Sequence, residues 1–169
     1  MKKIRLASVV SLALLVTFGL TAKAEMAKEG TYSATEYICG TVKVVPMGEK
    51  RFYLSYEYMG VLVSDTGKGF IHNMSVHGIG SLHGVKGMVE QESGIEVYTD
   101  SDGDKVFQDY KGTGGKLGVH TEGVGTFVGG TGKYTGITGE RKWSYTKLHP
   151  AAEGTFQGIV KIKGKYKLP

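Results

Sequence analysis

The chain has little cysteine and little proline, with one Cys and three Pro in 169 residues. A lone cysteine, Cys39, excludes an intramolecular disulfide, so folded stability has to come from packing and hydrogen bonds. Beside Ile38 in a predicted strand, Cys39 is expected to be buried and inert, with a reactive thiol as the alternative. The prolines at 46, 150 and 169 fall near predicted strand ends or the chain end, where no ladder hydrogen bond is lost.

Long apolar runs are absent apart from residues 6–20, near the N-terminus. A basic start at residues 2–5 precedes this run, and the small-x-small pattern read by signal peptidase follows at residues 22–24. The run is shorter than the roughly 20 residues that span a bilayer. Residues 1–24 are therefore interpreted as a signal peptide that exports a domain formed by residues 25–169, to the periplasm or outside the cell. A retained N-terminal anchor is the alternative.

A strong excess of either charge is also missing once residues 1–24 are set aside. The whole chain has 21 basic and 16 acidic residues, and its pI is about 9.1. All four charged residues of the predicted signal peptide are basic, which leaves 17 basic against 16 acidic residues. Nucleic-acid binding through a large positive field loses its main support, so we expect no nucleic-acid partner. No membrane association is expected after processing.

Alternation of apolar and polar residues dominates what remains, and no stretch of eleven or more residues shows the helical period of 3.6. One predicted face of residues 51–63 carries Phe52, Leu54, Tyr56, Tyr58 and Leu62. The last predicted strand places Phe156, Val160, Ile162 and Tyr166 opposite a row of lysines. Further strands are predicted near 32–45, 70–80, 85–90, 95–100, 105–111, 116–128 and 134–145. Eight or more short strands indicate an all-β barrel or sandwich.

The stretch GTFVGGTGKYTGITGE at residues 125–140 raises the question of a phosphate-binding loop. A Walker A loop is excluded because Tyr134 follows Lys133 and Phe127 stands where the first glycine belongs. A dinucleotide-binding loop is excluded because Val128 replaces a required glycine and no helix is predicted to follow. The sequence therefore argues against phosphate binding by this stretch.

These glycines are interpreted instead as geometric devices of a closed sheet. Gly129, Gly130 and Gly132 are predicted to form a tight connection that needs positive φ values. Gly136 and Gly139 are predicted to let the following strand bend or approach another backbone closely. Barrel closure requires such kinks.

An acidic run at residues 99–104 resembles the start of a calcium loop. Asp100, Asp102 and Asp104 match the first three EF-hand ligands, but lysines replace the glycine at position six and the glutamate at position twelve. The Asp102-Gly103 pair predicts a β-hairpin instead, with weak divalent-ion binding as the alternative. We predict neither a metal site nor a cofactor.

Histidines and aromatic residues supply the candidate site. On one continuous strand, His72 and His77 would point to opposite faces, and His77 and His83 would lie about 20 Å apart, so these histidines are not expected to share a metal. A histidine facing a cavity can still act as acid, base or hydrogen-bond donor. No activated nucleophile is visible. The predicted ligand-lining residues are Tyr56, Tyr58, His77, Trp143 and Tyr145, with plain packing of the barrel as the alternative role of the aromatic residues.

The run FVGGTGKYTGITG at residues 127–139 resembles the F-x-GG-[ST]-G-x-[FY]-x-G-x-x-G signature of the allene oxide cyclase and dirigent superfamily, and GTFQG at 154–158 also fits. The resemblance covers about residues 112–169. It implies an eight-stranded antiparallel β-barrel, calycin-like, with an internal cavity. In that superfamily the cyclases close an unstable fatty-acid epoxide, and the dirigent proteins steer the coupling of phenoxy radicals.

Three functions follow as expectations. The preferred one is noncovalent binding or positioning of a small, partly apolar or aromatic ligand inside the barrel. The second is a cyclase- or dirigent-like enzyme that guides a reactive intermediate by shape, exclusion of water and one polar group. The third is a structural or interaction module with a filled core. The superfamily resemblance is compatible with a homo-oligomer.

Overall fold

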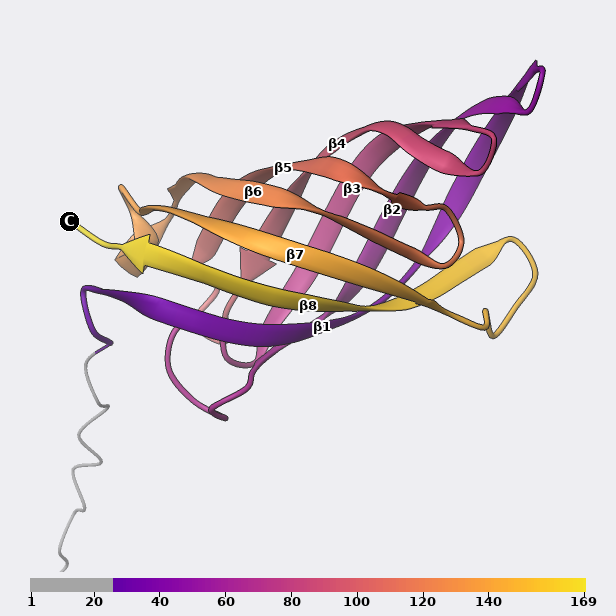
Figure 1. Ribbon diagram of the computed structural model, residues 1–169. Coiled ribbons are helices and arrows are strands. Elements are labelled where there is room, and N and C mark those ends of the chain that lie inside the picture. The colour runs from indigo at the N-terminus through magenta and orange to yellow at the C-terminus, as the bar shows by residue number, and fades with distance from the viewer. Residues whose placement is uncertain (1–25) are drawn as a thin grey trace, which may run out of the picture.

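The chain forms a closed antiparallel β-barrel whose last strand pairs with its first (Figure 1). The computed structural model describes residues 26–169, so the predicted signal peptide, residues 1–24, lies outside the described residues. The strands are β1 (Glu29–Gly48), β2 (Arg51–Ser64), β3 (Met74–Val85), β4 (Met88–Thr99), β5 (Lys105–Lys116), β6 (His120–Gly130), β7 (Thr138–Leu148) and β8 (Thr155–Lys167). This confirms the prediction of an eight-stranded antiparallel barrel.

Four predicted strand segments include turn residues in the structure: 70–80, 85–90, 116–128 and 134–145. The predicted segment 85–90 spans the turn between β3 and β4, where Lys86 and Gly87 have φ values of 51° and 82°. Two successive positive φ values form a tight hairpin turn, and Lys-Gly is a weaker signal for it than Asn-Gly or Asp-Gly. The predicted strand at 134–145 begins only at Thr138, because the short 3-10 helix η1 (Gly132–Tyr134) precedes it.

Strand alternation decides which side chains face the interior. In β2, Leu54, Tyr58 and Leu62 are buried, whereas their sequence neighbours are largely exposed. In β1 the same alternation buries Ile38 and exposes Cys39. The expectation that Cys39 is buried was therefore wrong: a residue next to an inward apolar side chain in a strand faces outward.

One end of the barrel is plugged by side chains from loops. The β2–β3 connection places Phe70 and Ile71 in the core, and the β6–β7 connection adds Tyr134 and Ile137. The Phe70 ring stacks on Tyr166 of β8, with 4.0 Å between ring centroids. At the other end lie the four turns β1–β2, β3–β4, β5–β6 and β7–β8, on the right in Figure 1. The barrel therefore has one closed end and one end bounded by hairpins.

Inward-facing glycines allow large aromatic rings to fit inside this barrel. Gly78 pairs with Tyr58 across β2 and β3, and Gly123 pairs with Trp143 across β6 and β7. A Cβ on Gly78 would lie 2.3 Å from Cζ of Tyr58, and one on Gly123 would lie 2.3 Å from Cζ2 of Trp143. Each ring thus occupies the space that a side chain on the paired residue would need.

The glycines singled out in the sequence lie at the β6–β7 connection and at the start of β7. Gly129, Gly132, Gly136 and Gly139 have positive φ values. Gly130 does not, but a Cβ there would lie 2.5 Å from the Tyr134 carbonyl oxygen. The stretch therefore consists of backbone conformations and close approaches that favour glycine.

The acidic loop between β4 and β5 forms ion pairs with a lysine from the β6–β7 connection. The loop forms a hairpin, as predicted, but with five residues between the strands instead of two. Lys133 of η1 forms ion pairs with Asp100 and, at 2.6 Å, with Asp102.

Within residues 26–169 no group of three or more His, Cys, Asp or Glu side chains is arranged to hold a metal ion. Over the same residues, none of the helices has the length and apolar character needed to cross a membrane.

Candidate ligand-binding cavity

The barrel contains a cavity of about 250 Å³ toward the end bounded by the hairpins. All eight strands contribute side chains to its wall, because β-barrel strands present every second side chain to the interior. Its apolar lining includes Ile38, Val42, Val44, Leu54, Leu82, Leu117, Phe156 and Val160. Its polar and aromatic lining includes Tyr56, Tyr58, Glu92, Glu96, Tyr110, Thr121, Arg141, Trp143, Tyr145 and Lys147. A largely apolar wall with a few convergent polar groups is typical of a small-molecule site.

The structure brings together four of the five residues that the sequence suggested as ligand contacts. Tyr56, Tyr58, Trp143 and Tyr145 all line the cavity. His77 does not: its Nε2 lies 2.8 Å from Oε1 of Glu57 on the exposed outer face of the barrel.

The orientation of His77 follows from the register between strands. Tyr58 faces the interior and pairs with Gly78, so Gly78 faces inward as well. His77, its neighbour in β3, must then face outward. The suggestion that His77 lines the interior was therefore wrong, and ligand binding by the other four residues stays a prediction.

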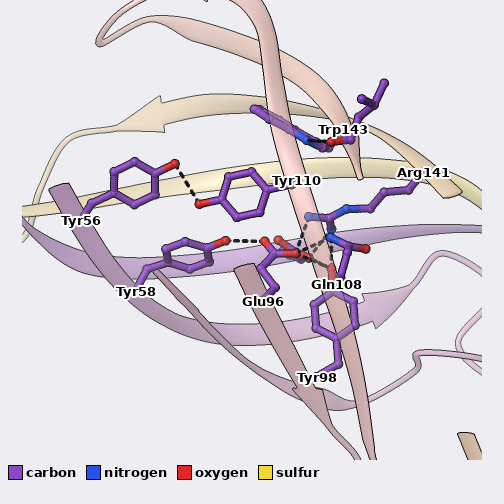
Figure 2. A network of polar contacts seen from close by, with 10 residues as sticks. Tyr56, Tyr58, Glu96, Tyr98, Gln108, Tyr110, Arg141 and Trp143 are labelled. Atoms are coloured by element: carbon purple, nitrogen blue, oxygen red, sulfur yellow. Dashed lines mark hydrogen bonds and ion pairs between the residues drawn. The ribbon is translucent and has the colours of Figure 1, made fainter. Parts of the chain in front are cut away.

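A chain of hydroxyl groups ends on a carboxylate in the cavity wall. The Tyr110 hydroxyl donates to the Tyr56 hydroxyl at 2.8 Å, and Tyr56 donates to Oε1 of Glu92 at 2.7 Å. Figure 2 shows the two tyrosine hydroxyls directed toward each other from opposite rings. The strand alternation of β2, β4 and β5 turns all three side chains inward, so the chain crosses three strands.

The cavity ends on an ion pair. Arg141 of β7 donates to Oε2 of Glu96 of β4, and the side chains of both residues are at least 97% buried, with exposures of 2% and 3%. Tyr58 donates its hydroxyl hydrogen to Oε1 of the same carboxylate (Figure 2). Gln108 donates from Nε2 to Oε2 at 2.7 Å. Glu96 is thus satisfied by one cation and neutral donors, as a buried carboxylate requires.

The Glu96–Arg141 pair forms the floor of the cavity, and a second carboxylate, that of Glu36, lies beyond it. Arg141 also donates from Nη1 to Oε1 of Glu36 at 2.8 Å, and the Glu36 side chain is fully buried. The Tyr98 hydroxyl lies 2.9 Å from Glu36 Oε1 and 2.7 Å from Glu96 Oε2, and it donates its single hydrogen to one of them at a time. One guanidinium therefore bridges two carboxylates across the barrel.

Sequence reasoning missed these charged residues. Glu36, Glu96 and Arg141 stand at inward positions of strands, each two residues from a buried apolar or aromatic residue of the same face. A charged residue in phase with buried neighbours was the available signal. This signal does not identify the pairing partners, which lie far apart in the chain and are brought together only by the barrel.

Burial changes the acidity of the groups around the cavity. Burial, and to a lesser degree the charge of Glu96, raises the pKa of Glu36 from 4.5 to about 7, although Arg141 opposes the rise. Burial also raises the pKa of Glu92, against the hydrogen bond from Tyr56. Burial raises the pKa of Tyr56, Tyr58 and Tyr110 above the usual value of 10.0. These tyrosines are neutral hydrogen-bond donors at physiological pH.

The raised pKa of Glu36 predicts an inverse dependence of stability on pH. The folded state binds more protons than the unfolded state between pH 4.5 and about 7. Stability from this group is therefore fully present below the lower value and is lost as pH rises through the upper one, by at most about 1.4 kcal/mol per pH unit. We expect the thermal midpoint, followed by circular dichroism, to fall across this window.

The Glu36→Gln variant should flatten this dependence without abolishing it, because the raised pKa of Glu92 acts in the same direction. Glu122→Gln, an exposed substitution on β6, is the matched control and should keep the wild-type slope. An unchanged slope in Glu36→Gln would contradict the assignment of this titration to Glu36.

Comparison with known proteins supports the fold. No protein-family model and no curated protein sequence matches the chain. Among solved structures, it is similar to the pterocarpan synthase dirigent protein GePTS1, with a TM-score of 0.51 and 10% sequence identity. The similarity covers 86% of this chain and 90% of that chain. The closed antiparallel eight-stranded barrel of this protein therefore has a dirigent-like fold.

Proposed function

We propose that the protein binds a small, partly apolar ligand inside the barrel. The observation that carries this proposal is the cavity of about 250 Å³, with its apolar and aromatic wall and its polar floor. An apolar cavity of roughly 150 Å³ is large enough for benzene. The cavity thus has room for one aromatic ring with a short substituent.

The two ends of the barrel support a binding role. The plug of Phe70 and Ile71 closes one end, and the buried pair Glu96–Arg141 separates that plug from the cavity. The cavity lies between this pair and the hairpin end, where Val44, Leu117 and Lys147 contribute to its lining. A ligand entering at the hairpin end would lose its water to apolar walls and meet hydrogen-bonding groups only at specific points.

Trp143, the sole tryptophan of the chain, is a built-in reporter because it lines the cavity. We expect a saturable change of its fluorescence when the protein is titrated with at least one single-ring probe: benzyl alcohol, benzyltrimethylammonium or phenylacetate. Native mass spectrometry of the purified protein would show whether a small molecule already occupies the site. The absence of a saturable change with all three probes, together with the absence of any bound molecule, would contradict the proposal.

A pair of variants on β1 tests whether the probes bind inside the barrel. Val42 lines the cavity, whereas Val45 is 59% exposed on the outer face. Val42→Phe should narrow the cavity and weaken probe binding by roughly tenfold or more, because the added ring competes for the same space. Val45→Phe adds the same ring to the outer face and should leave the affinity unchanged. Equal affinities in both variants would place the probe elsewhere.

A second function, guidance of a reactive intermediate, is favoured by one specific observation. Glu92 lines the cavity, its pKa is raised, and it accepts a hydrogen bond from Tyr56. Such a carboxyl group in a largely apolar cavity is suited to proton transfer. Recovery of a bound molecule that the protein alters over time would favour this role over simple binding. The cavity itself argues against the third expectation, a module with a filled core.

A further inference from the structure

Acidic side chains outnumber the basic side chains that pair with them in the interior of the barrel. Across residues 26–169, three carboxyl groups face the interior, those of Glu36, Glu92 and Glu96, and the buried guanidinium of Arg141 is the one base that pairs with them. Lys147 also lines the cavity, but it is exposed at the hairpin end. Arg141 bonds to Glu36 and Glu96, which leaves Glu92 outside this pairing.

Glu92 is poorly compensated where it stands. Its Oε1 accepts a hydrogen bond from Tyr56, and its buried Oε2 has no hydrogen-bond partner among the described residues. The carboxylate packs against Gly112 of β5, where a Cβ would lie 2.6 Å from Oε2. No ion pair joins Glu92 to a basic side chain of the described chain. A carboxylate in such a setting gains from a positive charge placed beside it.

The wall around Glu92 is rich in aromatic rings. Six rings line the cavity, those of Tyr56, Tyr58, Tyr110, Trp143, Tyr145 and Phe156. The faces of aromatic rings carry negative potential and attract organic cations, most strongly where water is excluded. Aromatic faces and an uncompensated carboxylate therefore favour the same sign of ligand charge. The Arg141 guanidinium at the floor is already neutralised by two carboxylates.

We propose that the cavity selects a small organic cation, an ammonium group attached to an apolar or aromatic body, and holds its charge beside Glu92 and the surrounding rings. This inference rests on the proposed function, since it names the class of ligand for the same cavity. The volume of about 250 Å³ limits that ligand to about one ring and a short chain.

The test compares two probes of the same shape. Benzyltrimethylammonium carries a permanent positive charge, and 2,2-dimethylpropylbenzene is its neutral carbon isostere. Their affinities are measured by Trp143 fluorescence and by competition between the probes, in the wild-type protein and in two variants. Glu92→Gln removes the charge and keeps an oxygen that accepts the hydrogen bond from Tyr56. Glu90→Gln makes the same change at an exposed position of β4 and is the matched control.

We expect the ratio of cation affinity to isostere affinity to fall roughly tenfold in Glu92→Gln and to stay unchanged in Glu90→Gln. The isostere should bind Glu92→Gln as well as it binds the wild-type protein. This equality also shows that the variant is folded with its cavity intact.

The pH dependence of cation binding provides a second readout. The cation favours the ionised form of Glu92, so its affinity should rise with pH through the raised pKa of this group and lose that rise in Glu92→Gln. The other titratable or charged groups of the cavity wall are Tyr56 and Tyr58 of β2, Glu96 of the same strand as Glu92, Tyr110 of β5, and Tyr145 and Lys147 of β7. Arg141 lies at the floor, and Glu36 lies beyond it. Any pH dependence that persists in Glu92→Gln belongs to these groups.

Each outcome separates the inference from the function on which it rests. An unchanged affinity ratio in Glu92→Gln would overturn the proposed cation selectivity while leaving ligand binding in place. Tighter binding of the isostere than of the cation by the wild-type protein would also overturn it. Failure of every probe to bind would contradict the proposed function itself.

Discussion

The Arg141→Met variant is expected to lose about 3–5 kcal/mol of its free energy of unfolding, the usual cost of removing one partner of a buried ion pair. The substitution leaves Glu36 and Glu96 buried side by side without their shared cation. In a domain of this size the loss corresponds to a fall of roughly 10 °C in the thermal midpoint. Urea unfolding followed by circular dichroism would measure it at neutral pH.

Two controls separate lost charge from lost packing. Lys142→Met changes an exposed cation in the same strand and should alter stability by no more than about 0.5 kcal/mol. Combining Arg141→Met with Glu36→Gln and Glu96→Gln removes the uncompensated charges and should recover much of the loss. A loss below about 1 kcal/mol in Arg141→Met would show that the two carboxylates do not depend on this arginine.

The Gly123→Ala variant is expected to destabilise the barrel by about 3 kcal/mol, at the upper end of the usual cost of overpacking. The added methyl group would lie 2.1 Å from the Lys111 carbonyl oxygen and 2.3 Å from Cζ2 of Trp143. The first contact is with backbone of the neighbouring strand, so rotation of a side chain cannot relieve it. The indole must also shift, which would change the fluorescence maximum of the folded protein.

Thr126→Ala is the control on the same strand, because Thr126 faces outward. It should cost no more than about 0.5 kcal/mol and should leave the fluorescence of Trp143 unchanged. If Gly123→Ala unfolds at the wild-type denaturant concentration, inward glycines are not what admits the aromatic rings to this barrel.

The all-β class could be predicted from local patterns, whereas the closed eight-stranded barrel was implied by the resemblance of residues 127–139 to a superfamily signature. A period of two residues requires strands, short segments separated by turn residues favour antiparallel hairpins, and glycines at inward positions suit a sheet that closes on itself. The alternation in β2 correctly grouped Leu54, Tyr58 and Leu62 on one face. The Lys86-Gly87 turn was missed because its residues give only a weak signal for positive φ.

The sequence by itself determined that the chain is built from strands, which residues of a strand share a face and where glycines are needed, because each depends on residues close together in the chain. Only the tertiary structure decided which face is the interior, since His77 and Cys39 turn outward through the register of their strands. It alone brought Arg141 to Glu36, 105 residues away in sequence. Pairing between distant strands fixes such contacts, and no local pattern specifies the partner of a buried charge.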